Sequence, residues 1–110
     1  MKKTRIFISK RAEIDIQEIT FYLALDNPLA ETKFREALES TFTLLSTMPD
    51  MGSTRDYHNP RISHLRMFPI TKFENFLIFY QSTDEEILIV RVLHGARDIA
   101  ALFEEEEENK

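Results

Sequence analysis

The segment "FENFLIFYQSTDEEILIVRVLH", Phe73 to His94, decides the fold of this chain. It contains two runs rich in β-branched and aromatic residues, 73–81 and 86–94, separated by a short polar stretch. A connection of this length typically joins neighbouring antiparallel strands. In both runs the two alternating sets of side chains are apolar, whereas a sheet with one wet face alternates apolar and polar residues. The segment therefore predicts a β-hairpin whose two faces are both at least partly covered.

The rest of the chain predicts one further hairpin strand, an early strand and three helices. Residues 62–70 precede the segment and connect to it through "TK", so they predict a third antiparallel strand. Strand 5–9, helices 10–25 and 28–47, a loop at 53–61 and a final helix at 96–105 complete the pattern. The order is β-α-α-β-β-β-α. It predicts an α+β fold in which a helical hairpin packs on a small antiparallel sheet.

The first helix carries two apolar stripes, whereas a surface helix normally carries one. Ile14, Phe21 and Leu25 form the second stripe, on nearly the opposite side from the first. Together with the two-sided strands, this stripe predicts apolar surface left over for a partner. We therefore expect that the isolated chain does not remain a simple monomer.

Composition places the chain among small soluble proteins with a neutral body. The 110 residues, 43% of them hydrophobic, suit a single domain over 1–103 followed by an acidic tail at 104–110. The net charge is −5, and Glu104 to Glu108 alone supply −5, so the rest of the chain is neutral. A neutral domain weakens a nucleic-acid interpretation, because phosphate binding normally needs a basic surface. No apolar run could span a bilayer and no secretion signal is evident, which predicts a cytoplasmic protein.

Neither a metal nor another cofactor is expected. The chain has no cysteine, and His58, His64 and His94 lack the spacing of metal ligands.

Four stretches together resemble a known family. They are "NPLAETKF", "LLSTMPDMG", "FENFLIFYQ" and "IVRVLHGARD", in this order. Over roughly residues 5–103 they resemble the RelE/ParE toxins of type II toxin–antitoxin systems, and the ending "RVLHGARD" resembles the ParE branch, known from plasmid stabilization. The resemblance implies the fold order given above and a small antitoxin that wraps the toxin. It also implies one of two activities: RelE-like members cleave mRNA on the ribosome, and ParE-like members bind and poison DNA gyrase.

A metal-free ribonuclease needs an acid, a base and cations around one phosphate. If this chain were such an enzyme, Arg66, His94 and Arg97 would be the catalytic candidates, with His64 and Tyr80 as outer candidates. Strand parity places His94 on the face of Val90 and Val92 and places Arg91 on the other, so without a bulge the two cannot share a site. Lysine is also sparse in the middle of the chain. We therefore favour no catalytic residue.

The same residues have other interpretations. His94, at a strand end beside Gly95, is expected to hydrogen-bond the backbone or a carboxylate and to fix the strand-to-helix corner. Arg66, Arg91 and Arg97 are expected to bind the target. Arg66 is the strongest of the three, because an arginine inside an apolar strand is poorly explained by folding alone.

The leading interpretation is a ParE-like toxin that inhibits DNA gyrase by binding, that is not an enzyme, and that forms a hetero-oligomer with a cognate antitoxin. The alternative is a RelE-like, ribosome-dependent mRNA endoribonuclease. A further alternative is an inactive toxin-fold protein kept as an antitoxin's partner.

Overall fold

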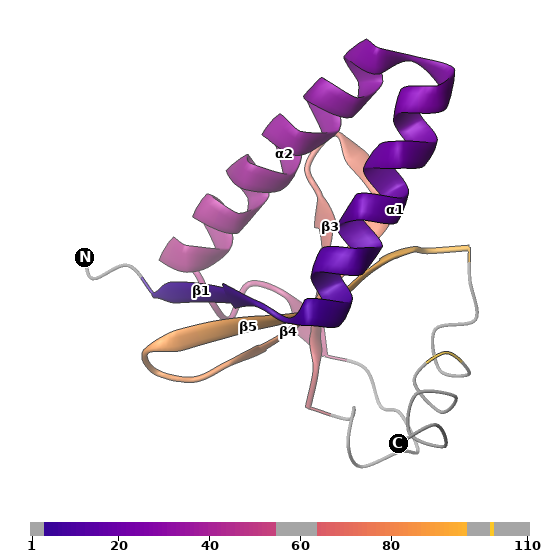
Figure 1. The fold of residues 1–110 in the computed structure, drawn as a ribbon. Helices are drawn as coiled ribbons and strands as arrows, with labels where there is room; N and C mark the ends of the chain where they lie inside the picture. The colour runs from indigo at the N-terminus through magenta and orange to yellow at the C-terminus, as the bar shows by residue number, and fades with distance from the viewer. Residues whose placement is uncertain (1–3, 55–63, 97–101, 103–110) are drawn as a thin grey trace.

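The computed structural model describes residues 4–54, 64–96 and 102. Its elements are β1 (Arg5–Ile8), α1 (Lys10–Asp26), α2 (Pro28–Thr47), β2 (Ser53–Thr54), β3 (Arg66–Ile70), β4 (Phe73–Ser82) and β5 (Glu86–His94). The two helices form a hairpin that rises from the sheet (Figure 1). Within the described part of the chain, no helix combines the length and apolar content needed to cross a bilayer.

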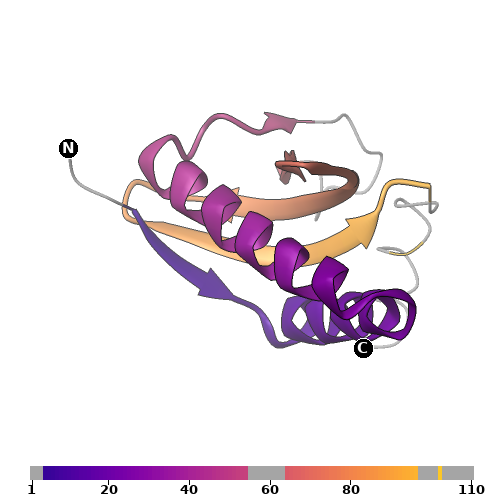
Figure 2. The ribbon, with the colours of Figure 1, turned by 90° about the horizontal axis from the view of Figure 1, so that it is seen from above.

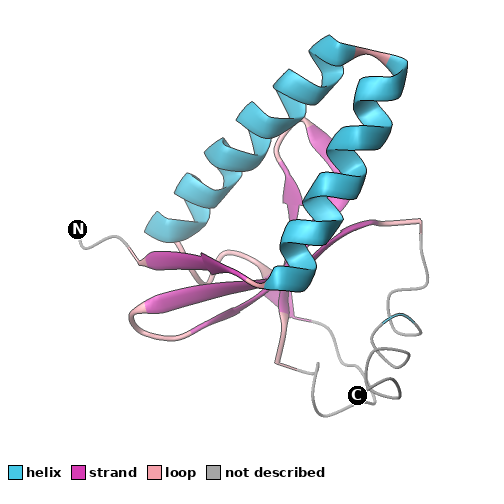
Figure 3. Cartoon of the chain, in the orientation of Figure 1, coloured by secondary structure: helices cyan, strands magenta, loops and turns pink. Residues whose placement is uncertain are grey.

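The sheet has five strands in the order β1-β5-β4-β3-β2. The meander β3-β4-β5 is antiparallel, as the sequence predicts. β1 differs because it pairs with β5 in parallel, so the sheet is mixed. The short β2 lies in a stretch that the sequence predicts to be a loop, and it pairs with β3. Both helices lie on one side of the sheet (Figure 3).

The predicted final helix, 96–105, falls almost entirely outside the described residues, as does the acidic tail.

One residue both ends α1 and begins α2. The Asn27 amide donates to the Leu23 carbonyl, which closes α1, and its side-chain oxygen accepts from the Leu29 amide at 3.0 Å, which caps α2. Pro28 fits the first turn of α2, where its missing amide hydrogen is not needed. A single residue therefore links the two helices. Figure 2 shows α2 running obliquely above the sheet.

A β-bulge in β5 changes which side chains share a face. Tyr80 pairs with Ile89 and Phe79 pairs with Arg91, which leaves Val90 as the extra residue. Val92 consequently packs in the core beneath the helices, while Val90 lies with Leu93 on the opposite face. The prediction that Val90 and Val92 share a face of the sheet was therefore wrong, because it assumed an uninterrupted alternation of side chains along β5.

Two apolar clusters cover the two faces of the sheet, as the segment at 73–94 predicts. The larger lies under the helices and the smaller lies on the other face. The larger one contains, among others, Phe34, Leu45, Ile78, Tyr80, Ile87 and Ile89. The smaller one is built on Leu65, Phe79 and Leu93, with Leu102 packed against it.

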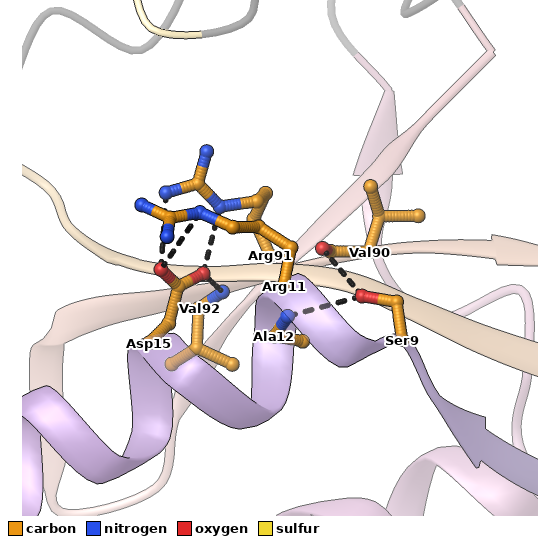
Figure 4. Close-up of polar contacts among 7 residues, drawn as sticks. All are labelled: Ser9, Arg11, Ala12, Asp15, Val90, Arg91 and Val92. Atoms are coloured by element: carbon orange, nitrogen blue, oxygen red, sulfur yellow. Dashed lines mark hydrogen bonds and ion pairs between the residues drawn. The ribbon is translucent and has the colours of Figure 1, made fainter. Parts of the chain in front are cut away.

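A buried carboxylate joins α1 to β5 beyond the point where β1 ends (Figure 4). Asp15 is 4% exposed. Its carboxylate accepts two hydrogen bonds from the Arg91 guanidinium, at 2.7 and 3.0 Å, and one from the Val92 amide at 3.1 Å. Arg11, one turn earlier in α1, approaches the same carboxylate at 3.9 Å.

The start of α1 is fixed at the same place. The Ser9 hydroxyl donates to the Val90 carbonyl at 3.0 Å and accepts from the Ala12 amide at 3.0 Å, capping the helix. The edge of β5 that β1 leaves open is thus closed by polar groups of α1 rather than by another strand.

Asp15→Ala is predicted to destabilise the protein by about 3–5 kcal/mol, because it removes the carboxylate that pairs with the buried Arg91 and accepts from the Val92 amide. The double variant Asp15→Leu, Arg91→Met should recover most of this loss, since well-packed apolar residues can replace a buried ion pair. Urea denaturation measures both. A loss below about 1 kcal/mol for Asp15→Ala, the size of an exposed ion pair, would contradict the prediction.

Candidate functional site

Arg66, the strongest target-binding candidate, holds the loop that follows α2. Its guanidinium donates to the carbonyls of Asp50 at 3.1 Å and Gly52 at 2.8 Å, and lies 3.7 Å from the Asp50 carboxylate. The expectation that folding poorly explains Arg66 was therefore wrong, because the residue secures the Pro49–Gly52 loop. Its side chain is still 29% exposed, so part of the cation remains accessible to a partner.

Tyr80, on β4, binds the same Pro49–Gly52 loop. Its hydroxyl donates to the Pro49 carbonyl and accepts from the Gly52 amide, both at 2.8 Å. Burial raises the pKa of Tyr80 above its ordinary value of 10.0, although the Gly52 hydrogen bond and the Arg66 charge lower it. Tyr80 is therefore a neutral, fully buried structural group at ordinary pH and is poorly suited to act as a base.

Gly52 allows this arrangement because it has no side chain. A methyl group at Gly52 would lie 2.5 Å from the Tyr80 oxygen, well inside van der Waals contact. The glycine is thus required by close approach to the tyrosine, and no positive φ is involved.

His94 occupies the corner at the end of β5. Its Nδ1 accepts a hydrogen bond from the Ala96 amide at 3.0 Å, so the proton of the neutral ring lies on Nε2. The ring packs edge-to-face on Phe76, with centroids 5.2 Å apart. The expected backbone hydrogen bond of His94 is therefore confirmed.

Arg91 lies in the buried ion pair with Asp15 and is 2% exposed. In this arrangement it has almost no surface to offer a target, which removes the physical basis for expecting it in the target-binding set. The expected separation of Arg91 from His94 holds despite the bulge, because Arg91 reaches α1 and His94 packs on β4. Arg97 lies outside the described residues.

Arg66 and His94, the two main nuclease candidates within the described residues, do not converge on one point. Arg66 pairs with Tyr80 across β3 and β4, whereas His94 pairs with Phe76 across β4 and β5. Tyr80 and Phe76 stand four residues apart on β4, which is about 13 Å along a strand. Arg66 and His94 also point to different partners, so they are not placed to act on one phosphate.

An apolar hairpin tip is the most exposed apolar feature of the described chain. It consists of Phe21, Tyr22, Leu25 and Leu29, each between 57% and 72% exposed. A hollow of about 370 Å³ lies there, lined by Tyr22, Leu23, Leu25 and Asp26. Phe21 and Leu25 of the predicted interface thus lie in the open, and Ile14 is half-buried.

Sequence reasoning missed Asp15 and Gly52. Asp15 carried a signal, because it falls on the apolar side of α1 between Ala12 and Ile19, and an acid there must find a buried partner. Gly52 carried a weaker signal, as one of only two glycines in the chain. Within the described ranges, no group of three or more acidic, histidine or cysteine side chains is placed to hold a metal ion.

Comparison with known proteins gives a family match and a structural match. The sequence model described as "ParE toxin of type II toxin-antitoxin system, parDE" matches residues 6–99. A solved chain from the chromosomal ParDE TA system of P. aeruginosa shares the fold, with a TM-score of 0.65 and 18% identity, over 86% of this chain and 98% of that one. No curated protein matches the chain.

Tyr80→Phe is predicted to lower the free energy of unfolding by about 1–3 kcal/mol at pH 7, because the buried Pro49 carbonyl and Gly52 amide lose their partner. Since the folded pKa of Tyr80 lies above the unfolded value of 10.0, its contribution is complete below pH 10 and declines as pH rises through the folded pKa. The difference between wild type and variant should therefore narrow in alkaline urea titrations. Tyr22→Phe is the control, because its side chain is exposed and should leave stability at pH 7 unchanged. A constant difference across pH 8–11 would show that Tyr80 ionises as readily folded as unfolded.

Proposed function

We propose, from the premise that this chain belongs to the ParE toxin family of type II toxin–antitoxin systems, that it inhibits DNA gyrase by binding and is neutralised by a cognate antitoxin. It would act in the cytoplasm as a binding protein and would form a hetero-oligomer with the antitoxin. The family match over residues 6–99 is the observation that carries this proposal.

The arrangement of polar residues supports binding over RNA cleavage. Arg66 and Tyr80 are engaged in holding the Pro49–Gly52 loop, and Arg91 is engaged with Asp15. His94 has one ring nitrogen in a backbone hydrogen bond and stands well away from Arg66 along the sheet. These residues therefore lack the shared reacting position that acid–base cleavage needs.

The apolar hairpin tip is the surface we assign to the antitoxin. It stands at the opposite end of the helices from the sheet (Figure 1), and its hollow beside Tyr22 and Leu25 can receive an apolar side chain. Contiguous exposed apolar patches mark interaction sites, and tyrosine is a frequent anchor of protein interfaces. Asp26 at the rim would favour a basic residue beside that anchor.

Expression of the chain in a bacterium is expected to stop DNA synthesis before protein synthesis. Gyrase poisoning blocks replication forks first and triggers a DNA damage response, while existing mRNA continues to be translated. Incorporation of labelled thymidine and labelled methionine, followed over the first minutes, separates the two. Rapid loss of translation with cleaved mRNA would instead establish the ribosome-dependent nuclease. Continued growth with folded protein present would establish an inactive toxin fold.

His94→Gln gives a second measurement within the same experiment. Glutamine keeps a side-chain acceptor for the Ala96 amide but cannot titrate, so toxicity should largely survive, with about 1 kcal/mol of stability lost for a weakened hydrogen bond. Abolished toxicity in a stably folded His94→Gln protein would indicate general acid–base catalysis.

Replacing Phe21 and Leu25 by serine is expected to weaken antitoxin binding by roughly 1–3 kcal/mol for each lost apolar anchor. Phe7→Ser is the matched control, because Phe7 is also an exposed phenylalanine, 45% accessible, but lies on β1 away from the tip. Isothermal titration with the protein encoded beside the toxin gives both affinities. Equal loss in the Phe7 variant, or no loss at the tip, would place the antitoxin elsewhere.

A further inference from the structure

A cleft of about 540 Å³ separates α2 from the turn between β3 and β4. One wall is a single side of α2, formed by Lys33, Glu36, Ala37 and Ser40. The other wall is the turn itself, Thr71 to Phe73. The volume lies within the range of small-molecule sites in proteins.

Two lysines line this cleft. Between residues 11 and 109 the sequence contains only two lysines, Lys33 and Lys72. They are 39 positions apart (72 − 33) in sequence, and the fold brings both to this cleft. The fold thus places the two lysines of the central chain in the same cleft.

Neither lysine has an ion-pair partner among the described residues, although the arginines there do. Arg5, Arg11, Arg35, Arg66 and Arg91 each pair with a carboxylate of the described chain. Lys33 and Lys72 appear in no such pair within the same ranges. The two ammonium groups therefore lie beside a concave surface without a carboxylate partner in the part of the chain that the structure describes.

The backbone holds Lys72 in an unfavourable conformation. Its φ is +72°, and it is the only residue other than glycine with a positive φ in the described chain. Glycine or asparagine is the usual residue at such a position, and strain of this kind often marks a functional site. The turn is rigidly attached, because the Thr71 amide donates to the Thr41 hydroxyl at 3.1 Å and that hydroxyl donates to the Ala37 carbonyl at 2.7 Å.

We propose that this lysine cleft, defined by Lys33, Ser40, Thr71 and Lys72, binds the phosphate of a phosphorylated small molecule. Lysine supplies a compact point charge that binds phosphate oxygens. The hydroxyls of Ser40 and Thr71 add hydrogen-bond donors. Ala37 and Phe73 supply apolar surface for the rest of the ligand.

The same chemistry disfavours a nucleic-acid backbone as the occupant. A backbone is held by many phosphate contacts along a basic surface. This body is neutral outside its acidic tail, and Glu36 stands within the cleft. Because the Glu36 carboxylate repels an anion, replacing Glu36 with glutamine should make the cleft bind a phosphate more tightly. Phosphate binding in this cleft does not depend on inhibition of gyrase.

Amide chemical shifts of the isotope-labelled full chain, titrated with inorganic phosphate and separately with adenosine monophosphate, test the site. We expect saturable shifts at residues 36–40 and 71–73 with both probes. Lys33→Gln and Lys72→Gly should each weaken binding about tenfold, the effect of losing one charge-assisted hydrogen bond. Lys72→Gly also relieves the positive φ, so its loss of binding cannot come from unfolding. Glu36→Gln should strengthen binding.

Lys10→Gln is the matched control, because Lys10 begins α1 outside the cleft and its loss should leave the affinity unchanged. Three results would overturn the proposal: no saturable shifts at the cleft with either probe, equal weakening by Lys10→Gln and Lys72→Gly, or cleft shifts produced by duplex DNA alone.

Discussion

The junction between α1 and β5 depends on one buried carboxylate. β1 pairs with β5 only as far as Ile89, whereas β5 continues to pair with β4 beyond the bulge, from Arg91 to His94, so the other edge of this stretch has no strand beside it. Asp15 supplies what the missing strand would have supplied, an acceptor for the Val92 amide, and neutralises Arg91 at the same time. The position of α1, and through Asn27 the direction of α2, follows from this contact.

Most of the fold follows from patterns that are local in the sequence. Hydrophobic periodicity places both helices, and α2 has the bounds that were predicted, because Asn27 and Pro28 form an unambiguous start signal. The strands of the meander follow from β-rich runs and short connections. The parallel partner of β1 and the bulge at Val90 were not predictable, because both depend on contacts between segments far apart in the chain.

The candidate site was less predictable for a related reason. Residue type identified Arg66, Arg91 and His94 as unusual, but it could not tell a structural cation from an available one. That distinction depends on Asp15 and on two carbonyls of the Pro49–Gly52 loop, none of which is near in sequence to the residue it binds. His94 was predictable, because its partner Ala96 is only two residues away. Lys33 and Lys72 show the converse case, in which ordinary residues become notable only where the fold brings them together.

The parallel pairing of β1 with β5 also affects how soon after synthesis the chain can reach its folded state. Ser9 and Val90 are 81 residues apart, and Asp15 and Arg91 are 76 apart, so these contacts close nearly the whole chain into a loop. Such long-range closure carries a large entropy cost before it yields any contact energy, and it slows folding relative to helical proteins of the same size. The helical hairpin can form from local contacts alone, whereas the sheet cannot be completed until β5 is available to pair with β1 and β4. Synthesis of the chain and appearance of its folded form are thus separate events in time.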